Sequence, residues 1–76
     1  MKETLTTIIK SLVTDELAVS INEIEAEKTV TYEVRVAEGD MGKVIGKEGR
    51  IAKAIRTIMK AQAAKDSKKI TIEFIG

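Results

Sequence analysis

The chain has 76 residues and a formal net charge of +1, and it contains no cysteine, histidine or proline. This length allows one domain with a modest core, too small for a doubly wound nucleotide-binding fold, and the lack of cysteine excludes disulfides, thiolate metal sites and cysteine nucleophiles. Because no long apolar run follows the N-terminus or occurs elsewhere, the sequence predicts a soluble cytoplasmic protein with no membrane partner.

The two halves of the chain carry opposite charge. Residues 1–40 contain four Lys or Arg and nine Asp or Glu, a balance of −5, whereas residues 41–76 contain nine and three, a balance of +6. This asymmetry indicates a polyanion partner for the second half, with the acidic residues elsewhere limiting indiscriminate adhesion. A solvated surface of mixed charge is the plainer interpretation.

The first predicted element is a helix over residues 3–14 with one apolar face, and Asp15 is expected to end it. The residues at helical spacing are Leu5, Ile8, Ile9, Leu12 and Val13. Residues 18–25 then begin as a strand, but Ile24 falls out of phase, which predicts a bulge or an early end of the strand. Residues 26–28 are the expected hairpin turn.

The second predicted strand covers residues 30–36 and has the clearest pattern in the chain. Apolar residues alternate strictly with polar ones: Val30, Tyr32, Val34 and Val36 with Thr31, Glu33 and Arg35. Such alternation is typical of a strand with one buried face and one solvated face.

Two helices and a last strand are predicted next. Residues 38–40 break the strand, and Asp40 is the expected N-cap of a short helix that Gly46 ends. The second helix spans residues 50–64. Its predicted buried residues are Ile51, Ile55, Ile58 and Met59, and its opposite, basic arc consists of Arg50, Lys53, Arg56 and Lys60.

The closing strand contains Ile70, Ile72 and Phe74, and a polar turn over residues 65–69 leads into it. No repeat, linker or low-complexity tract divides the chain. The sequence therefore predicts one domain over residues 1–76, an α+β fold in which a three-stranded sheet has its helices packed on one face.

The segment between the two helices is the most informative part of the chain. Gly46 and Gly49 interrupt the helical pattern, and Lys43, Lys47 and Arg50 surround them. Glycine permits close approach of another backbone, and a new helix N-terminus offers unpaired N–H groups. A phosphate is the natural ligand of such a place.

The order helix, strand, strand, helix, GxxG, helix, strand resembles a type II KH domain, the prokaryotic arrangement of this RNA-binding fold. The motif reads Val44-Ile45-Gly46-Lys47-Glu48-Gly49. An apolar pair precedes its first glycine, basic residues lie on both sides, and the motif stands between two helices. Over essentially its whole length the chain resembles the small bacterial proteins of the KhpA family, which consist of one KH domain.

The resemblance implies an RNA site. In KH domains the GxxG loop clamps the backbone of about four single-stranded nucleotides, while the bases lie over an apolar groove between the flanking helices and a sheet edge. The residues it assigns to RNA binding here are Lys43, Val44, Ile45, Gly46, Lys47, Glu48, Gly49, Arg50, Ala52 and Lys53. Lys47 would meet a phosphate, whereas Val44, Ile45 and Ala52 would form the groove floor.

Some of these residues have other interpretations. Many KH domains have a large aliphatic residue where this chain has Ala52, and Ile51 precedes it. Glu48 weakens the electrostatic clamp unless it points to solvent or supports the start of the helix. A second interpretation of Val44 and Ile45 is that they are plain core residues. Arg56 and Lys60, two or more turns from the loop, are expected to form a solvated face that at most steers RNA from a distance.

An enzyme is the first rival class. A Walker loop needs four residues between its first glycine and its Gly-Lys pair, whereas Gly42 and Gly46 enclose three, and Glu48 instead of Ser or Thr follows Lys47. The carboxylates have no histidine or cysteine to pair with. We therefore expect no enzymatic activity, no cofactor, no metal and no small-molecule substrate.

A protein-interaction module is the second rival. The resemblance implies a homodimer, a heteromer with a larger KH-containing protein, or both. An adaptor of this kind could bind RNA only secondarily or not at all. With RNA as the ligand, the family suggests a post-transcriptional regulator or RNA chaperone that acts on single strands.

Overall fold

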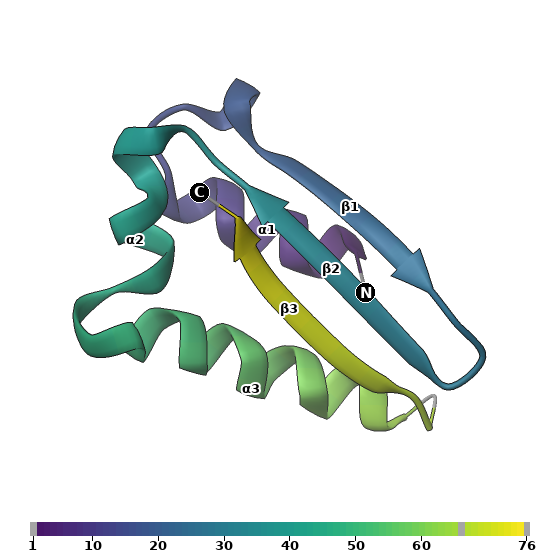
Figure 1. Cartoon of the computed structure of the whole chain (residues 1–76). Helices are drawn as coiled ribbons and strands as arrows, with labels where there is room; N and C mark the ends of the chain where they lie inside the picture. Colours follow the sequence, from purple (N-terminus) through teal and green to yellow (C-terminus); the bar gives the residue numbers. More distant parts are fainter. Residues whose placement is uncertain (1, 66, 76) are drawn as a thin grey trace.

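Residues 2–65 and 67–75 are described by a computed structural model, and in it they form three α-helices and one three-stranded sheet (Figure 1). The elements in chain order are α1 (Lys2–Leu12), β1 (Ser20–Glu25), β2 (Thr29–Arg35), α2 (Met41–Ile45), α3 (Arg50–Ala64) and β3 (Lys69–Ile75). Short 3-10 turns precede β1, α2 and α3 at η1 (Glu16–Ala18), η2 (Glu38–Asp40) and η3 (Lys47–Gly49).

The sheet has the strand order β1-β2-β3. β1 and β2 form an antiparallel hairpin in which Ser20 lies opposite Arg35 and Glu25 lies opposite Val30. β2 and β3 are parallel, with Thr29 beside Lys69. Because parallel strands cannot be joined by a tight turn, the chain needs a long crossover between them, and α2 and α3 form that crossover.

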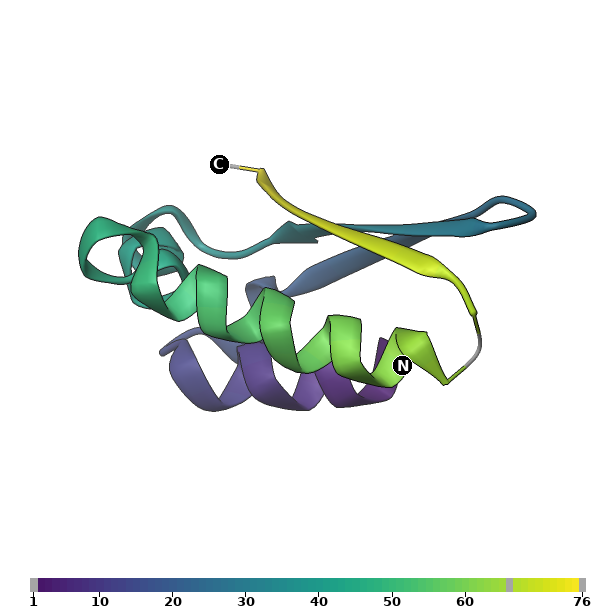
Figure 2. The ribbon, with the colours of Figure 1, turned by 90° about the horizontal axis from the view of Figure 1, so that it is seen from below.

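Both long helices, α1 and α3, lie on the same face of the sheet, as Figure 2 shows. This arrangement confirms the predicted α+β class and the predicted one-sided packing. The core between the layers is built from the apolar stripes of the helices and the inward residues of the strands. Its buried members are Leu5, Ile9, Val30, Tyr32, Val34, Val44, Ile55, Met59, Ala63, Ile70 and Ile72.

The helix α1 ends at Leu12, earlier than the predicted boundary near Asp15. The Asp15 N–H donates a hydrogen bond to Oδ2 of Asp40, 3.0 Å away, and therefore does not continue the helical ladder. A side chain distant in sequence thus decides where the helix ends, which a local pattern does not reveal.

The predicted irregularity at Ile24 is wrong. The pairing of β1 with β2 is continuous from Ser20 to Glu25, so there is no bulge in this strand. Ile24 lies opposite Thr31 on the outer face, half exposed, and Glu23 and Glu25 share the face of the core. These two carboxylates remain exposed, and Figure 2 shows the hairpin extending past the helices.

The buried stripe of α3 is shifted from the predicted one. Ala52, Ile55, Met59 and Ala63 are buried, whereas Ile58 is 47% exposed. Steps of three and four residues connect the buried positions, so Ile58 lies at the margin of the stripe. The helix boundaries agree with the prediction, and only the assignment of Ile58 to the core is wrong.

The phase of β2 can be tested by substitution. Val34 has no exposed surface, whereas Glu33 lies on the outer face and accepts a hydrogen bond from Asn22. We expect Val34→Asp to destabilise the fold by about 4 kcal/mol or more, which is comparable with the whole stability of a small domain. Thermal unfolding of Val34→Asp and of the control Glu33→Lys measures this. Similar melting temperatures of the two variants would contradict the assigned strand phase.

Candidate nucleic-acid interface

The glycine loop is a tight corner between α2 and α3. Gly46 ends α2 with φ +77° and ψ 174°, and its N–H donates to the Gly42 carbonyl at 2.8 Å. Gly49 has φ +75° and ψ 15° directly before α3 begins at Arg50. The N–H of Gly49 donates to the Gly46 carbonyl at 3.2 Å. The predicted end of one helix at Gly46 and start of the next after Gly49 are therefore confirmed.

The two glycines are needed for different reasons. A Cβ built at Gly46 would lie 2.6 Å from Cγ1 of Ile51, a separation that real contacts do not show, so this position needs both its positive φ and its missing side chain. A Cβ at Gly49 meets nothing within 4 Å, so only its left-handed backbone favours glycine. Ile51, partly buried, holds the loop close to the first turn of α3.

Glu48 also has a left-handed backbone, with φ 58° and ψ 24°. Its side chain is 70% exposed, and Oε2 lies 3.9 Å from Nη2 of Arg50, itself 79% exposed. An exposed pair of this kind contributes little to stability. Glu48 therefore points away from the core, beside the arginine at the start of α3.

The three cations around the loop differ in their surroundings. Lys43 lies on α2 and places Nζ 3.4 Å from Oδ1 of Asp40. Arg50 lies near Glu48, as described. Lys47 is exposed, and among the described residues it has no ion-pair partner within 4.0 Å. Lys47 is thus the cation of the loop whose charge is least compensated.

Asp40 is buried, with 1% of its surface exposed, and it connects α1 to the start of α2. Its carboxylate accepts hydrogen bonds from Oγ1 of Thr14 at 2.7 Å and from the Asp15 N–H at 3.0 Å. The predicted N-cap role is wrong, because Asp40 has a helical backbone and its side chain makes no cap hydrogen bond to α2. Its acceptors are turned toward the end of α1, where two donors would otherwise be unsatisfied.

The hydrogen bonds from Asp15 and Thr14 lower the pKa of Asp40 to about 2, with a smaller contribution from Lys43. The carboxylate is therefore ionised at every pH at which the protein is expected to work. Because α2 leads directly into the glycine loop, this buried charge anchors the element that positions Lys43, Gly46 and Lys47.

The apolar residues assigned to the groove floor differ in exposure. Val44 and Ala52 are buried, at 0% and 3% exposure, which leaves little surface for a base, whereas Ile45 is partly buried. Val44 belongs to the core cluster, and the short α2 contacts α1 and α3. Of the three residues, Ile45 is the one with accessible surface beside the loop. Lys53 is exposed one turn along α3 from Arg50.

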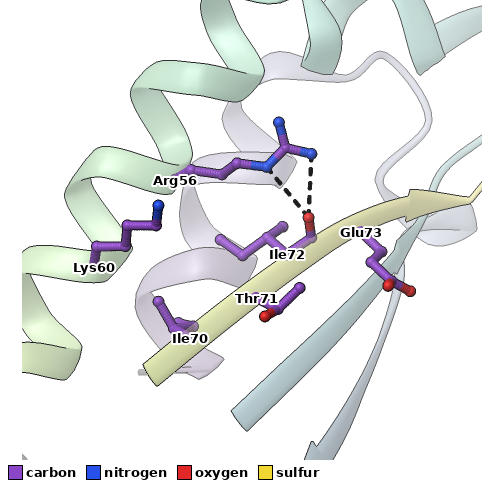
Figure 3. Close-up of a pocket in the computed structure, with 6 residues that line it drawn as sticks. All are labelled: Arg56, Lys60, Ile70, Thr71, Ile72 and Glu73. Carbon is purple, nitrogen blue, oxygen red and sulfur yellow. Dashed lines mark hydrogen bonds between the residues drawn. The ribbon is translucent and has the colours of Figure 1, made fainter. Parts of the chain in front are cut away.

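A hollow lies farther along α3, between this helix and β3. Its volume is about 370 Å³, and it is lined by Arg56, Lys60, Ile70, Thr71, Ile72 and Glu73 (Figure 3). The sequence predicted that Arg56 and Lys60 form a solvated face, and both side chains are exposed. They also border the edge of the sheet, where Arg56 donates hydrogen bonds to the Ile72 carbonyl. Helical spacing gives the face of a residue but not the strand beside it, so no sequence signal indicated this contact.

Residues 2–65 and 67–75 contain no group of three or more acidic, histidine or cysteine side chains that could hold a metal ion. None of the helices in these ranges is long and apolar enough to cross a membrane.

Comparisons with known proteins agree on one family. The family model described as KhpA/KhpB, KH domain matches residues 2–74. The chain is 52% identical over 75 residues to the RNA-binding protein KhpA of Clostridium acetobutylicum, covering 99% of this chain and 100% of that protein. It is 47% identical to KhpA of Listeria monocytogenes, with 99% of each chain covered, and 45% identical to KhpA of Chlamydia trachomatis, with 99% and 96% covered. No solved structure gives a significant match.

The role of Asp40 predicts a specific dependence on pH. Its pKa is about 2 when folded and 3.8 in an unperturbed carboxyl group, so the stability it contributes is present above pH 3.8 and is lost as the pH falls toward 2. We expect Asp40→Asn to be less stable than the parent at neutral pH, and the difference to shrink across this window.

Thermal unfolding of both proteins over that range measures the effect. Glu25, whose pKa is lowered by its hydrogen bond to Lys68, is present in both proteins and cancels in the difference. Parallel stability curves down to the lowest pH would contradict the assigned role of the Asp40 carboxylate.

Proposed function

Because the chain belongs to the KhpA/KhpB family of KH domains, we propose that it binds single-stranded RNA and clamps the RNA backbone with the loop from Gly46 to Gly49. The relatives named above are called RNA-binding proteins, and the match covers nearly the whole chain. The proposed role is that of a cytoplasmic post-transcriptional regulator or RNA chaperone, acting by binding and not by catalysis.

The observation that carries the proposal is the form of the loop. Gly46 and Gly49 leave two places without a side chain, and the exposed Lys47 stands between them. The first turn of α3 follows at once, and its N–H groups lack partners within the helix. Bare backbone, a helix N-terminus and an uncompensated lysine together suit a phosphate group.

The remaining site residues have graded roles in this proposal. Arg50 and Lys53 extend positive charge from the loop along α3, and Lys43 adds charge from α2. Ile45 supplies apolar surface beside the first glycine. Val44 and Ala52 are buried, so their role is to support the surface on which a base would lie and not to contact the base. Glu48 stays beside Arg50 and limits how strongly the loop attracts any anion.

Protein association is the alternative function, and the observation in its favour is the exposed side chain of Ile58. This aliphatic side chain is 47% exposed on α3, away from the glycine loop. A second copy of the chain, or a larger KH-containing protein, could cover it. Apolar association changes little with salt, whereas RNA binding weakens as salt rises, so the salt series described below distinguishes the two functions.

The proposal predicts a preference for unpaired RNA. A groove that accepts splayed bases cannot read the stacked bases of a duplex, so a single strand should bind more tightly than the same sequence paired with its complement. Fluorescence anisotropy with labelled RNA measures both. Affinity for the isolated domain should be low, since Tyr32 is buried and Phe74, the other aromatic residue, is partly buried and has the guanidinium of Arg56 over its ring. Tighter binding of the duplex would overturn the proposed mode.

The loop itself is tested by replacing Lys47 and Glu48 together with aspartate. Both glycines remain, and aspartate tolerates the left-handed backbone of position 48, so the fold should be retained. Binding of single-stranded RNA should weaken by about 1–3 kcal/mol. The slope of log K against log salt should fall by about 0.7, because one lysine contact to phosphate is lost.

Lys28→Asp is the matched control for this variant. It makes the same change in net charge, but in the hairpin turn, where aspartate is well accommodated. The control should bind RNA nearly as tightly as the parent. Circular dichroism checks that the loop variant is folded. If the folded variant binds RNA as tightly as the control at low salt, the loop only connects two helices.

A further inference from the structure

Leu17 lies outside the core of the domain. Its side chain is 99% exposed, in the middle of the 3-10 turn η1 that leads into β1. Hydrogen bonds hold this turn in place, because the Asp15 N–H donates to the Asp40 carboxylate and the Ala18 N–H donates to the Asp15 carbonyl at 3.2 Å. The backbone of the turn therefore keeps the leucine projecting into solvent at a fixed position.

Two carboxylates accompany this leucine. Asp15 and Glu16 are both exposed, and neither forms an ion pair with any residue that the structure describes. Single exposed apolar residues are ordinary on protein surfaces, so exposure alone assigns no role to Leu17. We call Asp15, Glu16 and Leu17 the acidic turn. Because its backbone is already ordered, a partner that binds it would not have to order it first.

The opposite edge of the sheet has the complementary surface. The hollow between α3 and β3 adjoins a second one of about 380 Å³, and the two share Lys60, Ile70 and Thr71 (Figure 3). We call them together the basic hollow. Its cations are Arg56, Lys60, Lys68 and Lys69. Its one carboxylate is Glu73, and Lys68 is the only one of the four cations with an ion-pair partner among the described residues.

The acidic turn and the basic hollow match in size and in charge. A leucine side chain is smaller than the 370 Å³ of the first hollow alone, and Ile70 and Ile72 give that hollow apolar lining. With Leu17 inserted, the carboxylates of Asp15 and Glu16 would lie at a rim that carries unpaired cations. Both the apolar side chain and its charged neighbours would thus find partners.

The two surfaces cannot meet within one chain. Leu17 precedes β1, the hollow borders β3, and these strands are the two edges of the sheet. Figure 1 shows the turn before β1 and the helix α3 on opposite sides of the molecule. A contact between them therefore joins two copies. Since each copy uses a different surface for its two neighbours, the contact is heterologous and can repeat from copy to copy.

We propose that the acidic turn of one copy docks into the basic hollow of a second copy, so that the protein associates head to tail. This contact is between proteins and does not depend on the proposed binding of RNA. One leucine and a few charges make a small interface, so the association is weak, with a dissociation constant on the order of 0.1 mM.

Sedimentation of the protein, freed of nucleic acid, tests the contact. The mass of the parent should rise with concentration and pass that of a dimer, because each end of a head-to-tail pair still offers one surface. Leu17→Asn should weaken the association roughly tenfold or more, since the burial of a leucine is lost. Its fold should be retained, because Leu17 is almost fully exposed. The control Ile24→Thr alters another exposed aliphatic side chain, on the outer face of the sheet, and should associate like the parent.

A mixing experiment tests which two surfaces meet. Lys60→Glu reverses a charge that lines both parts of the basic hollow, and Lys28→Glu makes the same change in the hairpin turn as its control. Leu17→Asn retains the hollow but lacks the leucine, whereas Lys60→Glu retains the acidic turn but has an altered hollow. Each variant alone should stay monomeric. Their equimolar mixture should form one-to-one dimers and nothing larger.

Several results would overturn the proposal. A parent that stays monomeric at about 1 mM has no such contact. A Leu17→Asn protein that associates like the parent, or a mixture of the two variants that stays monomeric, would exclude the pairing of these surfaces. Association that persists in Leu17→Asn but is lost in Ile58→Asn would assign the interface to α3. Circular dichroism checks each fold, and if Lys60→Glu is unfolded, the comparison of Leu17→Asn with the parent still decides.

Discussion

The parallel pairing of β2 with β3 is the constraint on which the rest of the structure depends. Parallel strands require the chain to travel from the end of one strand back to the beginning of the next, on one face of the sheet. Here α2 and α3 form this crossover connection, and α2 has only five residues. The chain must therefore turn sharply between them, and Gly46 and Gly49 adopt the backbone angles that such a turn needs. The candidate RNA site is therefore the loop at which the crossover turns from α2 into α3.

Charge within the site is adjusted by two acidic neighbours, Asp40 from the acidic half of the chain and Glu48 from the glycine loop itself. Asp40 is buried, satisfied by donors at the end of α1, and close to Lys43. Glu48 accompanies Arg50. The charge balance of residues 41–76 therefore overstates the uncompensated positive charge at the loop, and Lys47 is the loop cation without an ion-pair partner among the described residues. If the loop binds RNA as proposed, its backbone geometry contributes as well as its charge, and the acidic neighbours limit nonspecific adhesion.

The edge strand β3 is tied to α3 by a side-chain contact. An edge exposes backbone groups that need a partner, and Arg56 satisfies the Ile72 carbonyl with one side of its guanidinium. The guanidinium also lies over the ring of Phe74, with its Cζ 5.5 Å from the ring centroid. The two contacts hold the side chain of Arg56 against the edge strand.

The order of elements, the one-sided α+β architecture and the glycine corner were determined by the sequence alone, because they depend on local periodicity and on the conformational freedom of glycine. Other features depended on residues distant in sequence. Asp40 accepts a hydrogen bond at the end of α1 and does not cap α2. Ile58 lies at the margin of the buried stripe of α3 and is 47% exposed. Val44 is buried beneath the surface that it was expected to form. Arg56 is the clearest case: helical spacing placed it on a face, but only the packing of α3 beside an edge strand decided that this face meets a backbone carbonyl. Tertiary structure alone decides such contacts, because periodicity describes one element at a time and a contact belongs to two.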